Sequence, residues 1–396
     1  MQDLKKKLAY IEKPYRNEVR WWLSEGHHTD QTLINEVKML DEAGFGAAEF
    51  LAMGDYGIDV SRYGWGSEEF VHDTHLILEQ TTLRGMGASM TSGTNWSNAN
   101  LNNITPDDRA AAKELAFVAE EVPAGGRYSR QIPRPKITQA NVHEQTLIAV
   151  VAMKNLGPAA DGKRTLLPTD GVVLTGQVKD GFLNWKAPED GDYLLFSVWM
   201  QGTGQTASPS CSVNYTINYI DKYGTQALID YWNREVLTPS MRETLLKNGR
   251  VQLYMDSLEL STYANGGQLW GYDFMDEFKA RRGYDLTPHL PLVFKQKSMM
   301  MTAATPYLYV CQDETFFKKL INDLYQTMTD MYMENVLSPI QTWLHGVGMT
   351  LRAEISYGLP FEISEPGKYV DGIETESLEF ASQIDSYRGM AGAAHI

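Results

Sequence analysis

Two acidic residues that follow a short apolar stretch are well placed for catalysis. The stretch Val251 to Met255 is apolar, follows a glycine and predicts a buried β-strand. Asp256 and Glu259 lie just beyond its carboxyl end, where parallel strands of α/β barrels present catalytic groups. Two carboxyl groups can protonate a leaving oxygen and activate a water molecule. The alternative is structural: Asp256 caps a helix and Glu259 is a solvated loop residue.

Aromatic and histidine side chains add a second type of candidate. Aromatic rings stack on the apolar faces of sugars, although most of the nine Trp and 21 Tyr residues are expected in the core. Trp96 and Trp270 are predicted to lie in loops, so we expect them to line a carbohydrate site. His27 follows a predicted strand and could bond to sugar hydroxyls, or it is a bystander in a surface loop.

The elements that must position these residues alternate between strands and helices. Apolar strand-like runs occupy residues 19–23, 47–53, 87–91, 251–255, 349–355 and 370–376, and amphipathic helices are predicted between them. This rhythm is typical of a parallel sheet with crossover helices. Six such units fall short of the eight in a (β/α)8 barrel. We therefore expect a TIM-like barrel that is incomplete at the C-terminal end of this chain.

One region breaks the rhythm. Between about residues 131 and 212, short runs of alternating hydrophobicity are separated by Gly, Pro and Asp turn signals, a pattern typical of antiparallel strands. We expect an inserted β-sandwich-like module there. The predicted domains are residues 1–130 and 213–396 for the two parts of the barrel, and 131–212 for the insert.

Composition excludes several classes of protein. The formal net charge of −15 argues against a nucleic-acid partner, because phosphate binding requires a basic face. No stretch is long and apolar enough to span a membrane, and the first residues lack the apolar core of a signal peptide. Two cysteines, Cys211 and Cys311, suggest free thiols, with a single bridge as the alternative.

Several motifs together are similar to those of glycoside hydrolase family 106, the α-L-rhamnosidases. The most specific is the stretch YMDSLEL followed by EFKARRGYDLTPHLP, which resembles the acid-bearing strand and the conserved run after it in that family. SGTNW resembles the glycine-rich third loop, and VDGIETES resembles a later acidic segment. The resemblance covers most of the chain, although family members are considerably longer.

The resemblance implies roles for individual residues. Glu259 matches the general acid of an inverting hydrolase, and Glu376 matches a further active-site carboxylate. The base is then either Glu376 or a glutamate beyond Ile396. The family also implies calcium near the sugar hydroxyls, and oxygen ligands at strand ends could hold it. The candidates are Glu49, Asp55, Asp256 and Glu354. Asp256 and Glu354 are alternatively expected to contact the substrate.

The expected function is release of terminal L-rhamnose from a polysaccharide or glycoside. An inactive or truncated carbohydrate-binding homologue is the alternative, and another barrel hydrolase acting on a different deoxysugar is a third hypothesis. The expected partner is a carbohydrate, not a nucleic acid or a membrane. The resemblance implies a secreted or periplasmic protein, whereas the start of this chain leaves a cytoplasmic location open. The sequence is silent on oligomeric state.

Overall fold

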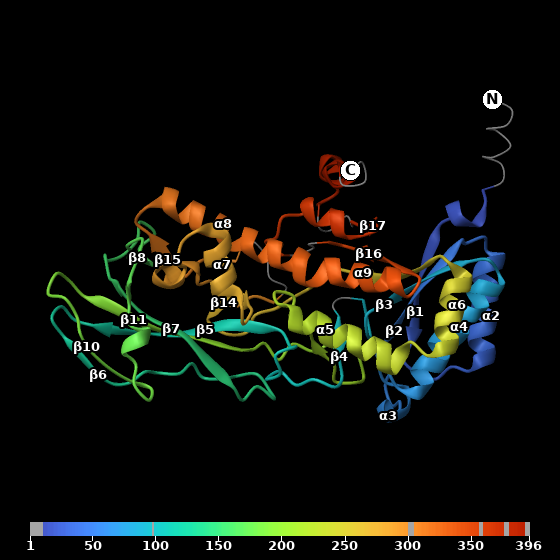
Figure 1. Ribbon diagram of the computed structural model, residues 1–396, viewed down its shortest axis with the longest axis horizontal. Helices are drawn as coiled ribbons and strands as arrows, with labels where there is room; N and C mark the ends of the chain where they lie inside the picture. The colour runs from blue at the N-terminus through green and yellow to red at the C-terminus, as the bar shows by residue number, and fades with distance from the viewer. Residues whose placement is uncertain (1–10, 97–98, 300–304, 356–358, 376–379, 393–396) are drawn as a thin grey trace.

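The fold places a parallel sheet and an antiparallel sheet at opposite ends of an elongated molecule (Figure 1). The structure is a computed structural model, and it describes residues 11–96, 99–299, 305–355, 359–375 and 380–392. The parallel sheet and its helices contain both the N-terminal strands and the last strands of the chain, while the middle of the chain forms most of the antiparallel sheet.

The parallel sheet contains the six strands that the sequence predicts. They are β1 (Glu18–Ser24), β2 (Ala47–Met53), β3 (Gly87–Thr91), β13 (Val251–Met255), β16 (Met349–Ala353) and β17 (Gly372–Ile373). The strands lie side by side in chain order, and every neighbouring pair is parallel. Within the described ranges the sheet is open, with β1 and β17 as its edges. The fold is therefore α/β, and no closed barrel is formed by this part of the chain.

Helices connect these strands. The first two connections use α2 (Asp30–Glu42), α3 (Val60–Tyr63) and α4 (Glu68–Leu83), and the later ones use α5 (Lys222–Tyr231), α6 (Pro239–Asn248), α7 (Phe274–Arg282), α8 (Glu314–Tyr332) and α9 (Ser338–Gly346). α10 (Ile384–Ala391) follows the last strand. Thr29 caps α2 by accepting a hydrogen bond from the backbone N–H of Thr32, as its position before an amphipathic run predicts. Single π turns at Trp232–Val236 and Met333–Leu337 follow α5 and join α8 to α9. Short 3₁₀ helices occur at Lys13–Tyr15, Thr175–Gln177, Thr287–Val293 and Glu365–Tyr369.

The parallel strands differ strongly between their two faces. Residues such as Leu253 and Leu351 are fully buried in one apolar cluster with Leu33 of α2 and Ile77 of α4. The alternate positions carry charged and polar side chains: Glu18, Arg20, Glu49, Gln252, Tyr254 and Arg352. Because successive side chains of a strand point to opposite sides, one face packs on the helices and the other gathers polar groups. Strand interiors of α/β barrels are more commonly filled by branched apolar residues.

The antiparallel sheet has five strands in the order β14-β5-β11-β7-β9. They are β5 (Lys113–Val122), β7 (Gln145–Lys154), β9 (Val172–Val173), β11 (Tyr193–Gly202) and β14 (Gly266–Trp270). A two-stranded sheet of β6 (Arg127–Gln131) and β10 (Phe182–Lys186) shares a second apolar cluster with it. Two further short pairs are β4 (Asn100–Leu101) with β12 (Tyr215–Thr216) and β8 (Thr165–Leu167) with β15 (Tyr309–Cys311).

This sheet extends beyond the module expected at residues 131–212. Strand β5 precedes those bounds, and β14 comes from the segment after β13. β14 pairs with β5 through Trp270 and Lys113, so the chain that leaves the parallel sheet supplies an edge of the antiparallel one. The sequence pattern missed this because a short strand rich in Gly and Gln lacks alternating hydrophobicity.

Two further expectations concern cysteines and membrane spans. Cys211 and Cys311 are both free, and Cys311 is buried. None of the described helices combines the length and the apolar character that crossing a membrane requires.

Candidate active site

The carboxyl ends of the parallel strands bring acids from several strands to one edge of the sheet. Asp256 follows β13 directly and Glu354 follows β16 directly, while Glu374 comes just after β17. Asp256 and Glu354 are both buried. Ligand sites of parallel α/β proteins form at this edge, because there the loops after neighbouring strands meet.

Arg20 of β1 is the first of two arginines that neutralise this cluster. Its guanidinium group lies 2.7 Å from a carboxylate oxygen of Asp256 and 2.7 Å from one of Glu49. It also donates a 2.9 Å hydrogen bond to the hydroxyl of Tyr254. These negative neighbours raise the pKa of Arg20 despite its partial burial. Asp256 is therefore held by a cation from a strand three places away in the sheet. The residues directly after it form a loop and not a helix, so Asp256 is not a helix cap.

Arg352 of β16 is the second arginine. It forms ion pairs with Glu18 at 2.6 Å and with Glu374 at 3.3 Å, and it also contacts Glu49. Burial raises the pKa of Glu49 to about 7, although Arg20 and Arg352 act in the opposite direction. Tyr254 contacts both arginines: its hydroxyl accepts from Arg20, and its ring lies against the guanidinium group of Arg352. The same hydroxyl donates to Glu354 at 3.3 Å, which connects the arginines to the strand ends. A continuous charged network thus covers the polar face of the sheet.

Glu259 lies in the loop after β13 and has its own set of partners. One carboxylate oxygen, Oε1, accepts hydrogen bonds from the hydroxyl of Ser257 at 3.1 Å and from the indole N–H of Trp96 at 3.3 Å. Trp96 in turn stacks on Trp22, with ring centroids 5.5 Å apart and planes inclined by 15°. These contacts fix the direction of the Glu259 carboxyl group.

The backbone of Glu259 is equally constrained. Its φ angle is 45°, in the left-handed region that few residues other than glycine adopt. The carboxamide of Gln205 donates to the Glu259 carbonyl at 2.9 Å and accepts from the Ser261 N–H at 2.9 Å. Glu114 of β5 accepts hydrogen bonds from the backbone N–H groups of Tyr263 and Ala264. The antiparallel module therefore anchors the loop that carries Glu259.

The structure brings together some of the predicted site residues. Asp256, Glu259 and Trp96 belong to the loops after β13 and β3, and Glu354 belongs to the same edge through Tyr254. His27 is exposed, and its imidazole faces Asp55 at 2.7 Å beyond the ends of β1 and β2. Glu376 lies outside the described residues.

The structure corrects the prediction made for Trp270. It does not lie in a loop but at the end of β14, where it is fully buried and packs against Phe274 with ring centroids 4.3 Å apart. A ring without exposed surface cannot stack on a sugar, so the prediction that Trp270 is a binding platform is wrong. Within the described residues, the acids proposed as calcium ligands form no group of three or more whose donor atoms all lie within 4.8 Å of one another. Asp55 pairs with His27, whereas Glu49 and Asp256 pair with Arg20.

Sequence reasoning missed Arg20, Tyr254, Arg352 and Gln205. The first three had a signal: polar residues at every second position of strands that otherwise read as buried, as in EVRWW, QLYMD and LRAE. Gln205 had none, because its role depends on a contact between two parts of the chain that are 54 residues apart.

Comparisons with known proteins agree with this architecture. The α/β fold, with Asp256 and Glu259 in the loop after β13, is typical of an enzyme whose active site lies at the strand ends. Residues 150–365, more than half of the chain, match the family model of the α-L-rhamnosidases, glycoside hydrolase family 106, and the chain belongs to this family. No curated protein matches the sequence.

A solved structure extends the likeness of the fold to most of the chain. It is the rhamnosidase from Novosphingobium sp. PP1Y, which is similar with a TM-score of 0.68 and 12% sequence identity. The match covers 93% of this chain and 49% of that one. The chain thus spans about half the length of this relative.

Proposed function

We propose that this chain contributes to the active site of an α-L-rhamnosidase, which releases terminal L-rhamnose from a polysaccharide or glycoside with inversion. Membership of the family supports the reaction class. The observation that carries the assignment of residues is the pair Asp256 and Glu259 at the carboxyl end of β13. There Asp256 is paired with Arg20 and Glu259 is oriented by Trp96 and Ser257.

Glu259 is the proposed general acid. Both described hydrogen bonds to its carboxyl group end on Oε1, so Oε2 is the oxygen that can carry a proton towards the leaving group. An inverting hydrolase also needs a carboxylate base about 6.5–9.5 Å from the acid, with a water molecule between them. Glu376, or a glutamate beyond Ile396, is the proposed base. Asp256 and Glu354 are proposed to contact sugar hydroxyls at the rim.

The six parallel strands are proposed to be part of a (β/α)8-type barrel. Strands that follow chain order without a reversal support a barrel, because doubly wound sheets reverse their order at a switch point. Residues 1–130 and 213–396 are proposed to contain the barrel parts, and the inserted module is proposed to comprise residues 131–212 together with β5 and β14 from the flanking parts. Calcium binding and a secreted or periplasmic location are proposed from the family resemblance.

Hydrolysis of a chromogenic α-L-rhamnoside tests the function. With Glu376 as the base, the wild-type chain is expected to release rhamnose, and Glu259→Gln is expected to abolish turnover with an unchanged circular dichroism spectrum. Glu243→Gln, an exposed residue of α6, is the matched control and is expected to retain activity. Retained turnover in Glu259→Gln contradicts the general-acid role.

The alternative is a carbohydrate-binding homologue without turnover. Titration with L-rhamnose separates it from the hydrolase, because binding without release of product from any rhamnoside is the result that it predicts. A chain that neither binds rhamnose nor hydrolyses rhamnosides contradicts both proposals.

A further inference from the structure

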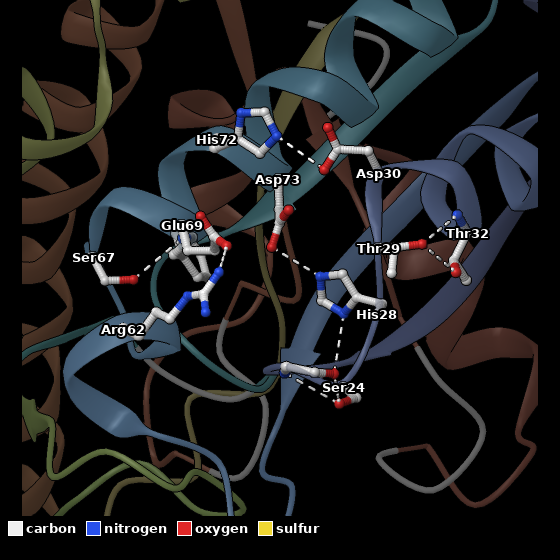
Figure 2. Close-up of polar contacts among 12 residues, drawn as sticks. Ser24, His28, Thr29, Asp30, Thr32, Arg62, Ser67, Glu69, His72 and Asp73 are labelled. Atoms are coloured by element: carbon white, nitrogen blue, oxygen red, sulfur yellow. Dashed lines mark hydrogen bonds and ion pairs between the residues drawn. The ribbon is translucent and has the colours of Figure 1, made fainter.

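Two short motifs rich in histidine and aspartate face each other where the loop after β1 meets α4. HHTD at residues 27–30 forms the connection from β1 to α2, and HDTH at residues 72–75 lies within α4. Figure 2 shows side chains from both motifs turned towards the same space. Within the described part of the chain, Asp30, His72 and Asp73 are the one group of possible metal ligands whose donor atoms all lie within 4.8 Å of one another.

The spacing of the first two ligands suits a small divalent ion. Nε2 of His72 lies 3.1 Å from Oδ1 of Asp30. Two ligand atoms at about 2.0–2.2 Å from a tetrahedral zinc ion are roughly 3.3 Å apart. A zinc-sized ion therefore fits between these atoms with almost no movement. Both side chains are at least half exposed, so a bound ion would be open to water on one side.

The third ligand is already held in place. Asp73 is largely buried, and one of its carboxylate oxygens lies 2.8 Å from Nε2 of His28, whose side chain is 8% exposed. The other ring nitrogen of His28 lies 3.1 Å from the carbonyl oxygen of Gly26. Outer-shell partners of this kind orient the carboxylates that bind metals and contribute to affinity.

We propose that Asp30, His72 and Asp73 form a binding site for one divalent transition-metal ion of the zinc class, with His28 as the residue that positions Asp73. One imidazole and two carboxylates favour a borderline ion such as zinc over calcium, which prefers oxygen ligands alone. Three protein ligands leave further positions for water. A bound ion joins the loop after β1 to α4. The inference is independent of the proposed hydrolase activity.

Titration of the metal-free chain with zinc chloride, followed by calorimetry, tests this site. One zinc ion is expected to bind per chain, and cobalt(II) is expected to bind with the visible absorption of a low-coordinate ion. His72→Ala and Asp73→Asn are each expected to weaken zinc binding by at least tenfold. His28→Gln is expected to weaken it by about tenfold, the loss that an outer-shell partner typically causes.

His75→Ala is the matched control. His75 lies one turn along α4 from His72, but its imidazole faces Thr244 at 3.1 Å and it is outside the cluster. Zinc binding is expected to be unchanged in this variant. The proposal is overturned if the wild-type chain binds no zinc, if it binds calcium but not zinc, or if His72→Ala and Asp73→Asn bind zinc as tightly as His75→Ala does.

Discussion

The carboxamide of Gln205 holds the backbone of Glu259 in its left-handed conformation. Its nitrogen donates to the Glu259 carbonyl at 2.9 Å, and its oxygen accepts from the N–H of Ser261 at 2.9 Å. Gln205 follows β11 of the antiparallel sheet, whereas Glu259 follows β13 of the parallel sheet. The position of the proposed acid therefore depends on the contact between the two sheets.

Removal of this clamp is expected to lower turnover. In Gln205→Ala the backbone of Glu259 is released from a φ angle of 45°, and the carboxyl group moves out of line with the substrate. A displacement of about 1 Å in an active site costs up to roughly 100-fold in rate. We expect kcat for a chromogenic rhamnoside to fall by roughly 10- to 100-fold with a smaller change in KM. Gln205→Glu keeps the acceptor for Ser261 and is expected to lose less activity; equal kcat in wild type and Gln205→Ala would contradict the role.

Trp96 is expected to act through its indole N–H. Trp96→Phe keeps an aromatic ring against Trp22 but removes the hydrogen bond to Glu259 at 3.3 Å. Loss of a hydrogen bond to a charged or acidic group corresponds to about 1.5 kcal/mol, or roughly a tenfold lower kcat. Tyr56→Phe, at an exposed aromatic residue after β2, is the control with no expected change. Full activity of Trp96→Phe in steady-state kinetics would contradict the proposed role of Trp96.

Arg20 is expected to stabilise the fold. Arg20→Met leaves the nearly buried carboxylate of Asp256 without its ion pair, while Glu49 keeps Arg352. Breaking a buried pair by removing one partner costs about 3 kcal/mol. Urea denaturation is expected to show a loss of that order. Lys38→Met removes an exposed pair with Glu42 and is expected to change the free energy of unfolding by less than about 1 kcal/mol. Equal effects of the two substitutions would rule out a role for the buried pair.

Glu114 is expected to make stability depend on pH. Burial raises the pKa of Glu114 from 4.5 to about 7, even though two backbone N–H groups and Gln201 donate to its carboxylate. The folded-state pKa lies above the unfolded value, so the protonated acid favours folding. Its contribution is complete below pH 4.5 and is lost as pH rises through about 7. The expected loss over this interval is about 3 kcal/mol.

Urea denaturation at several pH values checks this expectation. In Glu114→Gln the carboxyl group no longer titrates, so the free energy of unfolding should change less between pH 4.5 and 7 than in wild type. Glu121→Gln, at an exposed position of the same strand, should leave the wild-type pH dependence unchanged. A pH profile of Glu114→Gln that parallels wild type would show that Glu114 is not the titrating group.

The sequence was sufficient to predict the fold at the level of strands and helices. Buried strands such as Val251–Met255 are short apolar runs bounded by turn signals. Helices such as α2 have a capping residue and an apolar stripe, and both features can be read from the sequence wherever the helix lies in the fold. These signals are local. The partner of β14 was not predictable, because pairing between distant segments leaves no periodic trace in either one.

The candidate site was predictable in part for the same reason. Asp256 and Glu259 were found because catalytic acids follow strand ends, which is a local pattern. Trp270 was misassigned because a tryptophan near turn residues reads as a loop residue, and only the packing against Phe274 places it in the core. The arginines that neutralise Asp256 and Glu49 left a local signal, polar residues at every second position of β1 and β16. Their ion pairs join segments far apart in the chain, so the pairing itself could not be predicted.

The pairing of β14 with β5 has a consequence for how this protein can be rebuilt. A graft limited to residues 131–212 would exchange three strands of a five-stranded sheet, and Lys113–Val122, which carries Gly266–Trp270 on its other side, would then pair with a foreign β11. Chimaeras with relatives should therefore take crossover points before residue 113 and after residue 270, so that the acid-bearing loop is inherited together with the sheet that supports it.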